Sequence, residues 1–433
     1  MSEPLLNATN LRKEFATREG GSHVVLDGIN VSLHEDEVVA LLGRSGSGKS
    51  TLLRCLIGLS RPTSGDVSYR GQPVTGLIPD AAMVFQTFAL FPWLTVQQNV
   101  ELALEGKGLT REERTKRALA MLDVIGLDGF ESAFPKELSG GMRQRVGFAR
   151  ALAASPQVLF MDEPFSALDV LTSENLRGEL LDLWLERRIP TRCILIVTHN
   201  IEEAIEMADR VLVLGTNPGR IRAEVSVTLR RPRDRDDPAF RELVDRVYEI
   251  MTTPQEQSTT TPAPDPVWRR LPLAPINRLK GLLDRVAEGP DHGHDDLPVL
   301  AEEMRLDVDD LFPLTDALEI LGFAKVSDGD ITLTPAGQAF AEADILRQKE
   351  IFAEHLLEHV PLIARIRKVL DTRPDGRAPR ERFLHELEDT LTGPDADETL
   401  EVATDWGRYA ELFEFDANSG VFTLDPGPTT PKP

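Results

Sequence analysis

A glycine-rich stretch at residues 43–51 offers the residue types that phosphate chemistry needs. Its glycines let backbone N–H groups turn inward around phosphate oxygens, and the helix expected after it adds the positive end of its dipole. Lys49 can reach the β- and γ-phosphates of a nucleotide, and the Ser50 hydroxyl can ligate Mg²⁺. The stretch consists of Gly43, Arg44, Ser45, Gly46, Ser47, Gly48, Lys49, Ser50 and Thr51.

The elements expected around this stretch are those that a phosphate-binding loop requires. The apolar run at residues 38–42 predicts a buried strand before the loop, and residues 52–58 predict a helix after it. Strand, glycine-rich turn and helix in this order make a chance match improbable. We therefore expect a nucleoside triphosphate and Mg²⁺ to bind here, while the loop alone does not indicate what the nucleotide is used for.

Two carboxylates follow another apolar run, at residues 158–161. Acidic side chains at the carboxyl end of a strand lie where an open α/β sheet binds its ligands. We expect Asp162 to hold Mg²⁺, directly or through water, and Glu163 to polarise the attacking water. His199 follows the β-branched run 192–197, which predicts a strand. We expect this histidine to contact the γ-phosphate at the same edge of the sheet. Without the phosphate loop, exposed loop carboxylates and a structural histidine would be the simpler interpretation.

A second potential anion site lies at Ser139, Gly140 and Gly141, which open a predicted helix over residues 143–154. A serine and two glycines at a helix start can cap the helix and can also present backbone N–H groups to an anion. An ordinary N-cap is the alternative interpretation.

An unusually apolar segment, residues 87–96, begins directly after Gln86 and contains Pro92. Gln86 itself follows a predicted buried strand at residues 82–85. Two interpretations of the segment are open. It is either a loop that covers the core or an exposed apolar surface that receives a partner.

Length and composition set the outer limits. At 433 residues the chain is expected to form at least two domains. Its two cysteines lie in a predicted helix and a predicted strand, as small buried residues of a protein in a reducing cytoplasm would. We expect no signal peptide at the N-terminus, and no apolar run approaches the ~18 residues that a membrane span needs.

Taken in order, these motifs resemble the nucleotide-binding subunits of ABC transporters over residues 1–251. The resemblance implies a P-loop NTPase of ABC type with an α/β fold: a mixed sheet core, a helical subdomain and an antiparallel β subdomain. The matching pieces are the phosphate loop (Walker A) 43–51, Gln86, the run Leu138-Ser139-Gly140-Gly141-Met142-Arg143-Gln144-Arg145, the acidic strand end 159–164, the turn 166–169 and His199.

The resemblance also implies roles for individual residues. Two chains would sandwich two ATP molecules head to tail, so that the phosphate loop of one chain faces Ser139–Gly141 of the other at the γ-phosphate. Asp169 would lie across the dimer interface. Gln86 would relay the nucleotide state to the apolar segment, which resembles the surface that receives a coupling helix of a membrane partner. The implied catalytic residues are Lys49, Gln86, Glu163 and His199, and the implied Mg²⁺ ligands are Ser50, Gln86 and Asp162.

The β-rich run at residues 4–15 predicts an edge strand, and it ends at Phe15. Phe15 matches the aromatic residue that stacks on adenine in this family. A core aromatic is the alternative interpretation.

Beyond this region, residues 252–266 predict a linker by composition, and residues 267–433 predict a smaller α+β domain. Two groups of helices, each followed by a hairpin, resemble tandem winged helices and the AAA-associated C-terminal extension of some ATPases of the nitrate/sulfonate group. The expected helices are 276–287, 298–305, 311–322, 380–391 and 398–410, and the expected hairpins are 323–334 and 412–424. His292 and His294 form either a weak metal site or, as we favour, part of a solvated loop.

The charge of this second domain bears on its partners. Residues 265–433 contain 35 Asp and Glu against 18 Lys and Arg, out of a net charge of −23 for the chain. An acidic surface repels nucleic-acid phosphates, so no nucleic acid is expected as a partner. Protein contact, as dimerisation, regulation or docking, is the favoured role.

Within the family, residues 90–96 and 215–221 are most similar to importers of nitrate, sulfonates, taurine or bicarbonate. The resemblance implies an ATPase that energises import as a peripheral dimer at the cytoplasmic face of the inner membrane. It would dock on a polytopic permease and depend indirectly on a solute-binding protein. The alternative is a soluble ABC-type ATPase that acts on ribosomes or nucleic acid through its C-terminal domain. That class is expected to carry tandem cassettes or a long basic insertion, and this sequence contains neither.

Overall fold

The structure is a computed structural model that describes residues 3–16, 22–253, 270–289 and 292–424. The chain divides into two units, Met1–Val247 and Tyr248–Pro433. The division falls inside one helix, α7 (Pro238–Thr252), slightly before the domain limit that the sequence suggests. The linker expected at residues 252–266 lies mostly outside the described residues.

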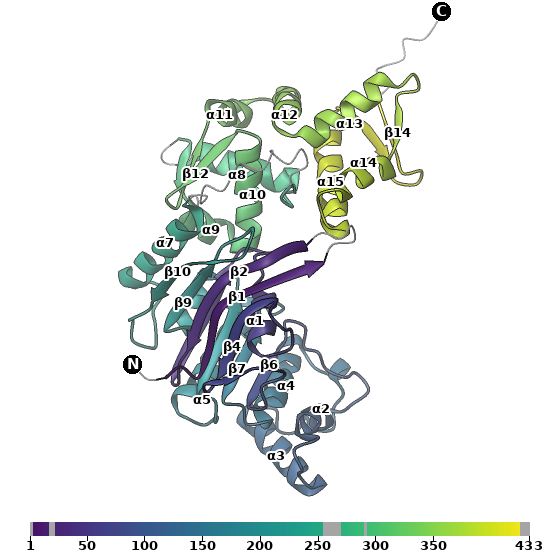
Figure 1. Cartoon of the computed structure of the whole chain (residues 1–433). Helices are drawn as coiled ribbons and strands as arrows, with labels where there is room; N and C mark the ends of the chain where they lie inside the picture. The colour runs from purple at the N-terminus through teal and green to yellow at the C-terminus, as the bar shows by residue number, and fades with distance from the viewer. Residues whose placement is uncertain (1–2, 17–21, 254–269, 290–291, 425–433) are drawn as a thin grey trace, which may run out of the picture. The chain divides into compact units, whose positions relative to one another are not determined.

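A six-stranded sheet forms the centre of the first unit (Figure 1). Its strands are parallel apart from β10, which is antiparallel to β9. Every residue of β7 and β8 is buried, as expected for parallel strands covered on both faces. In sheet order the strands are β10 (Ile221–Ser226), β9 (Arg210–Leu214), β3 (Glu37–Gly43), β8 (Cys193–Thr198), β7 (Val158–Asp162) and β6 (Ala81–Val84).

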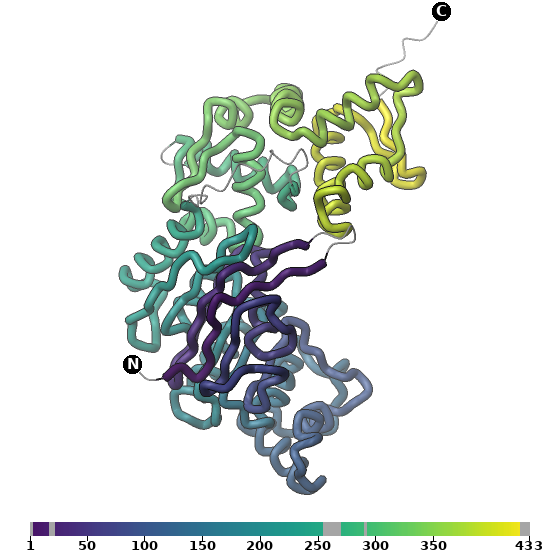
Figure 2. Tube along the Cα trace, viewed as in Figure 1, coloured from purple at the N-terminus to yellow at the C-terminus, as the bar shows by residue number. Residues whose placement is uncertain are grey.

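A four-stranded antiparallel sheet stands beside it, and its long β1–β2 ribbon is easily followed in the Cα trace (Figure 2). The order is β2 (Ser22–Leu33), β1 (Leu6–Ala16), β4 (Ser64–Tyr69) and β5 (Gln72–Pro73). The prediction that residues 4–15 form an edge strand is therefore wrong. β1 is an inner strand because β4, far along the chain, returns to pair with its second edge.

Helices complete the first unit. α2 (Val96–Glu101), α3 (Arg111–Val124) and α4 (Gly140–Ala153) pack on one another as a helical group. α1 (Lys49–Leu56), α5 (Val170–Leu185) and α6 (Ile201–Met207) each follow a strand of the central sheet. The mixed sheet, the helical group and the antiparallel sheet confirm the predicted fold class.

The second unit repeats one order of elements twice: helix, strand, helix, helix and hairpin. Two helices, α11 (Pro335–Glu342) and α12 (Ile345–His359), separate the repeats. The first repeat comprises α8 (Ile276–Glu288), β11 (His294–Asp296), α9 (Leu297–Met304), α10 (Val308–Ile320), β12 (Ala324–Ser327) and β13 (Asp330–Leu333). The second comprises α13 (Pro361–Thr372), β14 (Arg377–Pro379), α14 (Arg380–Glu388), α15 (Gly393–Tyr409), β15 (Glu414–Asp416) and β16 (Val421–Thr423).

The two small sheets have matching strand orders, β11-β13-β12 and β14-β16-β15. Their first strands, β11 and β14, are missing from the sequence-based prediction because three residues carry too little periodicity to be recognised. The likeness to winged helices stays a prediction.

We favour a solvated loop for residues 292–296 from the sequence, and this interpretation is wrong for His294–Asp296, which form the strand β11. His294 lies in β11, and its Nδ1 is 2.9 Å from the Thr332 hydroxyl of β13. Within the described residues, neither His292 nor His294 belongs to a group of three or more potential metal ligands. Among the helices that the structure describes, none is long and apolar enough to cross a membrane.

Two helical glycines give a matched test of the packing. A Cβ on Gly337 of α11 would lie 2.0 Å from the Phe323 carbonyl oxygen, whereas nothing lies within 4 Å of one on Gly178 of α5. We expect Gly337→Ala to lower the free energy of unfolding by about 1–3 kcal/mol through overpacking. Gly178→Ala should raise it by up to about 1 kcal/mol through helix propensity. Urea unfolding of the two variants measures both changes in the free energy of unfolding. If the two substitutions have equal effects, the close packing of Gly337 against Phe323 is contradicted.

Candidate functional site

The phosphate loop connects β3 to α1, as the sequence predicts. Gly46 and Gly48 have φ values of 75° and 97°, in the left-handed region that favours glycine. A Cβ on Gly43 would lie 2.7 Å from the Leu214 carbonyl oxygen, so the loop also needs glycine where it leaves the sheet. Residues 43–51 therefore keep their backbone open to an anion because three positions lack a side chain.

Lys49 is 5% exposed and curls back over the loop. Its Nζ donates to the carbonyl oxygens of Gly43 at 2.6 Å and Arg44 at 3.1 Å. The ammonium group thus lies at the loop itself, where phosphate oxygens are expected.

Ser50 and Asp162 meet at the start of α1. The Ser50 hydroxyl donates to Asp162 Oδ1 at 3.0 Å. Burial raises the pKa of Asp162, and the Ser50 hydrogen bond opposes this effect. A hydroxyl and a carboxylate side by side form the oxygen donor set that Mg²⁺ takes alongside phosphate oxygens and water, so these residues fit the ion.

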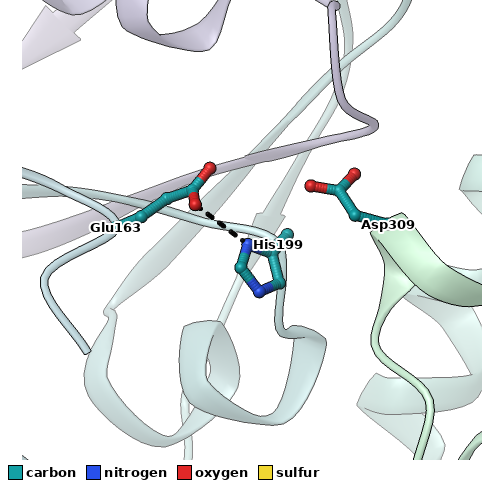
Figure 3. Close-up of side chains that lie close together, drawn as sticks. All are labelled: Glu163, His199 and Asp309. Atoms are coloured by element: carbon teal, nitrogen blue, oxygen red, sulfur yellow. Dashed lines mark ion pairs between the residues drawn. The ribbon is translucent and has the colours of Figure 1, made fainter. Parts of the chain in front are cut away.

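Glu163 lies between two polar partners. Its Oε2 accepts a hydrogen bond from Gln86 Nε2 at 3.0 Å and lies 3.3 Å from His199 Nδ1 (Figure 3). Hydrogen bonding to His199 lowers the pKa of Glu163, against the effect of burial. The backbone of Glu163 is left-handed, with φ of 46°, and its N–H donates to the Val197 carbonyl. The ionised form of the carboxylate is therefore favoured, and two polar side chains hold it, which suits the role in polarising water that the sequence predicts.

These side chains come together because their strands are paired in register. Leu42 of β3 pairs with Thr198 of β8, and Val197 of β8 pairs with Asp162 of β7. Parallel strands place their carboxyl ends at one edge of a sheet. The phosphate loop, the acidic pair and His199 therefore share that edge.

The second predicted anion site forms its own group of contacts. Ser139 caps α4 by accepting from the Met142 N–H, and Asp169 caps α5 by accepting from the Thr172 N–H at 3.1 Å. A Cβ on Gly141 would lie 2.5 Å from Thr172 Cγ2. The starts of α4 and α5 are thus in close contact. Sequence reasoning missed Thr172, whose signal is its position three residues after a capping aspartate.

Phe15 is 48% exposed at the end of β1, and Lys13 Nζ lies 5.0 Å from its ring centroid. A core aromatic would be buried, so the exposed ring supports its interpretation as a stacking platform.

The apolar segment after Gln86 is also exposed in part. Trp93 is 69% exposed and packs edge to face on Phe91, with 5.3 Å between the ring centroids. A loop that only covers the core would bury these rings, so the exposed pair favours a partner surface.

A buried ion pair connects the helices that follow Asp169 and His199. Arg177 of α5 donates to Glu203 of α6 at 3.3 Å, and both side chains are less than a tenth exposed. Burial raises the pKa of Glu203, and the charge of Arg177 acts against this. The pair fixes α5 against α6, and no sequence motif predicts it.

The comparisons with known proteins agree with this geometry. Residues 26–166 match the ABC transporter family, and residues 298–416 match the C-terminal AAA-associated domain. The chain is 46% identical over 250 residues to the nitrate import ATP-binding protein NrtD of Synechocystis sp., covering 58% of this chain and 90% of that protein.

Two further relatives have related names. The bicarbonate transport ATP-binding protein CmpD of Synechocystis sp. is 40% identical over 245 residues, covering 55% of this chain and 86% of its own. The taurine import ATP-binding protein TauB of Burkholderia thailandensis is 46% identical over 217 residues, covering 50% and 82%.

The fold and the site define a P-loop ATPase that binds and hydrolyses ATP. The chain belongs to the ATP-binding subunits of ABC transporters, and a C-terminal AAA-associated domain follows its cassette.

The Arg177–Glu203 pair makes a pH-dependent contribution to stability. A carboxyl group whose folded pKa lies above its unfolded value stabilises the fold at low pH, and this contribution is lost as the pH rises through the folded pKa. Removal of Arg177 raises the pKa of Glu203 further. The folded protein therefore loses more stability when the pH rises and Glu203 must ionise. We expect Arg177→Met to cost about 3–5 kcal/mol at about pH 8 and clearly less at about pH 5.

Thermal unfolding at the two pH values measures this difference. Arg187→Met serves as the control, because the Arg187–Asp36 pair is exposed and such pairs contribute about 0–1 kcal/mol. If Arg177→Met lowers the free energy of unfolding equally at both pH values, Arg177 does not affect the ionisation of Glu203 and this interpretation is wrong.

Proposed function

We propose that this chain is the ATP-hydrolysing subunit of an ABC importer for an anion of the nitrate, sulfonate, taurine or bicarbonate kind. It works as a head-to-tail dimer on a polytopic permease at the cytoplasmic face of the membrane. The names of the relatives support the solute class. One observation supports the proposed dimer. A single chain contains two helices, α1 and α4, whose glycine-containing N-termini are each suited to bind a phosphate group.

Each residue of the site then has a chemical task. Lys49 and the loop N–H groups bind the β- and γ-phosphates, while Ser50, Asp162 and Gln86 would hold Mg²⁺, which supplies charge neutralisation at the phosphates. Glu163 accepts a hydrogen bond from the attacking water, and His199 orients Glu163 and contacts the γ-phosphate. Phe15 stacks on the adenine ring.

The partner chain completes the site. Ser139, Gly140 and Gly141 of one chain would donate to the γ-phosphate bound by the other chain, and Asp169 would lie beside them at the interface. Closure of the dimer would therefore depend on the γ-phosphate, and hydrolysis would release it.

The acidic C-terminal unit is assigned to protein contact. Its charge disfavours the alternative, a soluble ATPase that acts on ribosomes or nucleic acid, because binding to phosphate backbones needs basic side chains. Dimerisation, regulation of closure and docking on the permease are the roles that remain for it.

A complementation experiment tests the shared site. Glu163→Gln and Ser139→Ala should each abolish turnover alone, and the Glu163→Gln chain should accumulate as a dimer with ATP and Mg²⁺. In a mixed dimer, one site combines the intact Glu163 of one chain with the intact Ser139 of the other. Equal mixing should therefore restore up to about a quarter of the wild-type ATPase rate.

The control is a chain with both substitutions, which should restore nothing when mixed with either single variant. If the equal mixture of single variants stays inactive although mixed dimers are recovered through different affinity tags on the two variants, each chain builds its site alone and the shared site is refuted.

Co-purification separates the two functional classes. We expect the chain, expressed in its native cell and extracted in mild detergent, to recover a polytopic membrane protein. Trp93→Glu should abolish this recovery because it places a charge in the exposed apolar pair. Recovery of ribosomes or nucleic acid by both versions would favour the alternative.

A further inference from the structure

One face of α4 is turned toward residues 86–96, which we call the docking segment. Arg143, Gly147 and Arg150 are spaced four and three residues apart, so they lie on the same face of the helix. The Arg143 guanidinium lies 5.0 Å from the ring centroid of Phe88. A Cβ on Gly147 would lie 3.7 Å from the Phe88 carbonyl oxygen. The helix backbone itself therefore approaches the segment closely.

Arg150 makes the strongest of these contacts. Its Nη1 donates to the Ala89 carbonyl at 2.5 Å and its Nη2 to the Phe88 carbonyl at 3.3 Å. Ala89 is left-handed, with φ of 48°, a conformation that is unfavourable for a residue with a side chain. The guanidinium thus bonds two successive carbonyl groups on either side of a left-handed residue through two separate nitrogens of one rigid plane, whereas a lysine would offer a single, flexibly held nitrogen.

The remaining attachments of the docking segment divide between two places. Gln86, at its start, is bonded to Glu163. Near its end, the fully buried Asn99 of α2 accepts from the Phe91 N–H at 2.8 Å and donates to the Leu94 carbonyl at 3.1 Å. Because α2 packs on α4, most of the segment is attached to the helical group and only Gln86 to the catalytic carboxylate.

We propose that Arg150 is a positioning residue that couples the docking segment to the helix that begins at Ser139. The segment then responds to the nucleotide on the partner chain's phosphate loop as well as to the nucleotide on its own. This inference rests on the proposed head-to-tail dimer.

The physical route is short. In the closed dimer, Ser139–Gly141 follows the γ-phosphate of the other chain, and α4 moves with its own first turn because a helix is stiff along its axis. Arg150 lies about 16 Å from Ser139 along that axis. Its two bonds to the backbone of residues 88–89 transmit the movement without passing through Gln86.

The alternative is that Arg150 only satisfies two carbonyl groups and stabilises the fold. A control bond to the end of the same helix distinguishes this. Lys107 Nζ donates at 2.6 Å to the carbonyl of Ala154, directly after α4 and outside residues 86–96. Lys107→Met therefore removes a cation-to-carbonyl bond from this helix without cutting the proposed coupling.

The test measures amide hydrogen exchange of residues 87–94 in the full chain, with and without a non-hydrolysable ATP analogue and Mg²⁺. All variants carry Gln86→Ala, which cuts the route from the chain's own site. We expect this chain to keep at least about half of the wild-type, analogue-induced slowing of exchange. Adding Arg150→Met should abolish the slowing, Arg150→Lys should leave part of it, and Lys107→Met should leave all of it.

The outcomes separate this inference from the proposed function, because light scattering reports dimer formation in every sample. Two results refute the coupling through Arg150 while the dimer itself is confirmed. In the first, dimers form and Gln86→Ala alone removes all of the analogue-induced slowing of exchange. In the second, dimers form and the slowing persists after Arg150→Met is added. If the wild-type chain binds the analogue and stays a monomer, both fail. If Arg150→Met does not fold, the comparison of Arg150→Lys with Lys107→Met decides, and equal responses overturn the inference.

Discussion

Parallel pairing of β3, β8 and β7 determines where the phosphate loop, Asp162, Glu163 and His199 lie. These strands are buried along almost their whole length, so a slip in their register would push an apolar residue out of the core at one end and draw a polar residue into it at the other. The register that satisfies burial also aligns the strand ends, and the phosphate loop, Asp162 and His199 leave the sheet at one edge. The packing of the core therefore determines where the site residues lie, and hydrogen bonds within the site make smaller adjustments to their side chains.

Much of this could be predicted because the signals are local. A glycine-rich turn between an apolar run and a helix, and polar residues at the ends of apolar runs, specify the phosphate loop, Asp162, Glu163 and His199 in one sequence. The bond from Gln86 to Glu163, the contact of Gly141 with Thr172 and the Arg177–Glu203 pair each join residues far apart in the chain. No pattern within one segment encodes them. For the same reason the inner position of β1 was missed, because β4 decides it from outside the strand.

The second unit shows the opposite balance. Five of its helices, α8, α9, α10, α14 and α15, were predicted from their amphipathic patterns, whereas α11, α12 and α13 were not. The three-residue strands β11 and β14 were also missed, since they exist only by pairing with β13 and β16. The repeated order of elements is therefore visible in the structure and only partly in the sequence. The excess of acidic residues in this unit supports the proposal that it binds proteins rather than nucleic acid.

The position of Lys49 has a consequence for selectivity. Its ammonium group is held by two carbonyl oxygens of the loop, so the loop contains an internal competitor for any incoming anion. Such a held lysine attracts a singly charged anion less than a polyphosphate, which offers more charge and more oxygens to the same ammonium group. The position of this lysine therefore favours a ligand of high charge density over a singly charged inorganic anion.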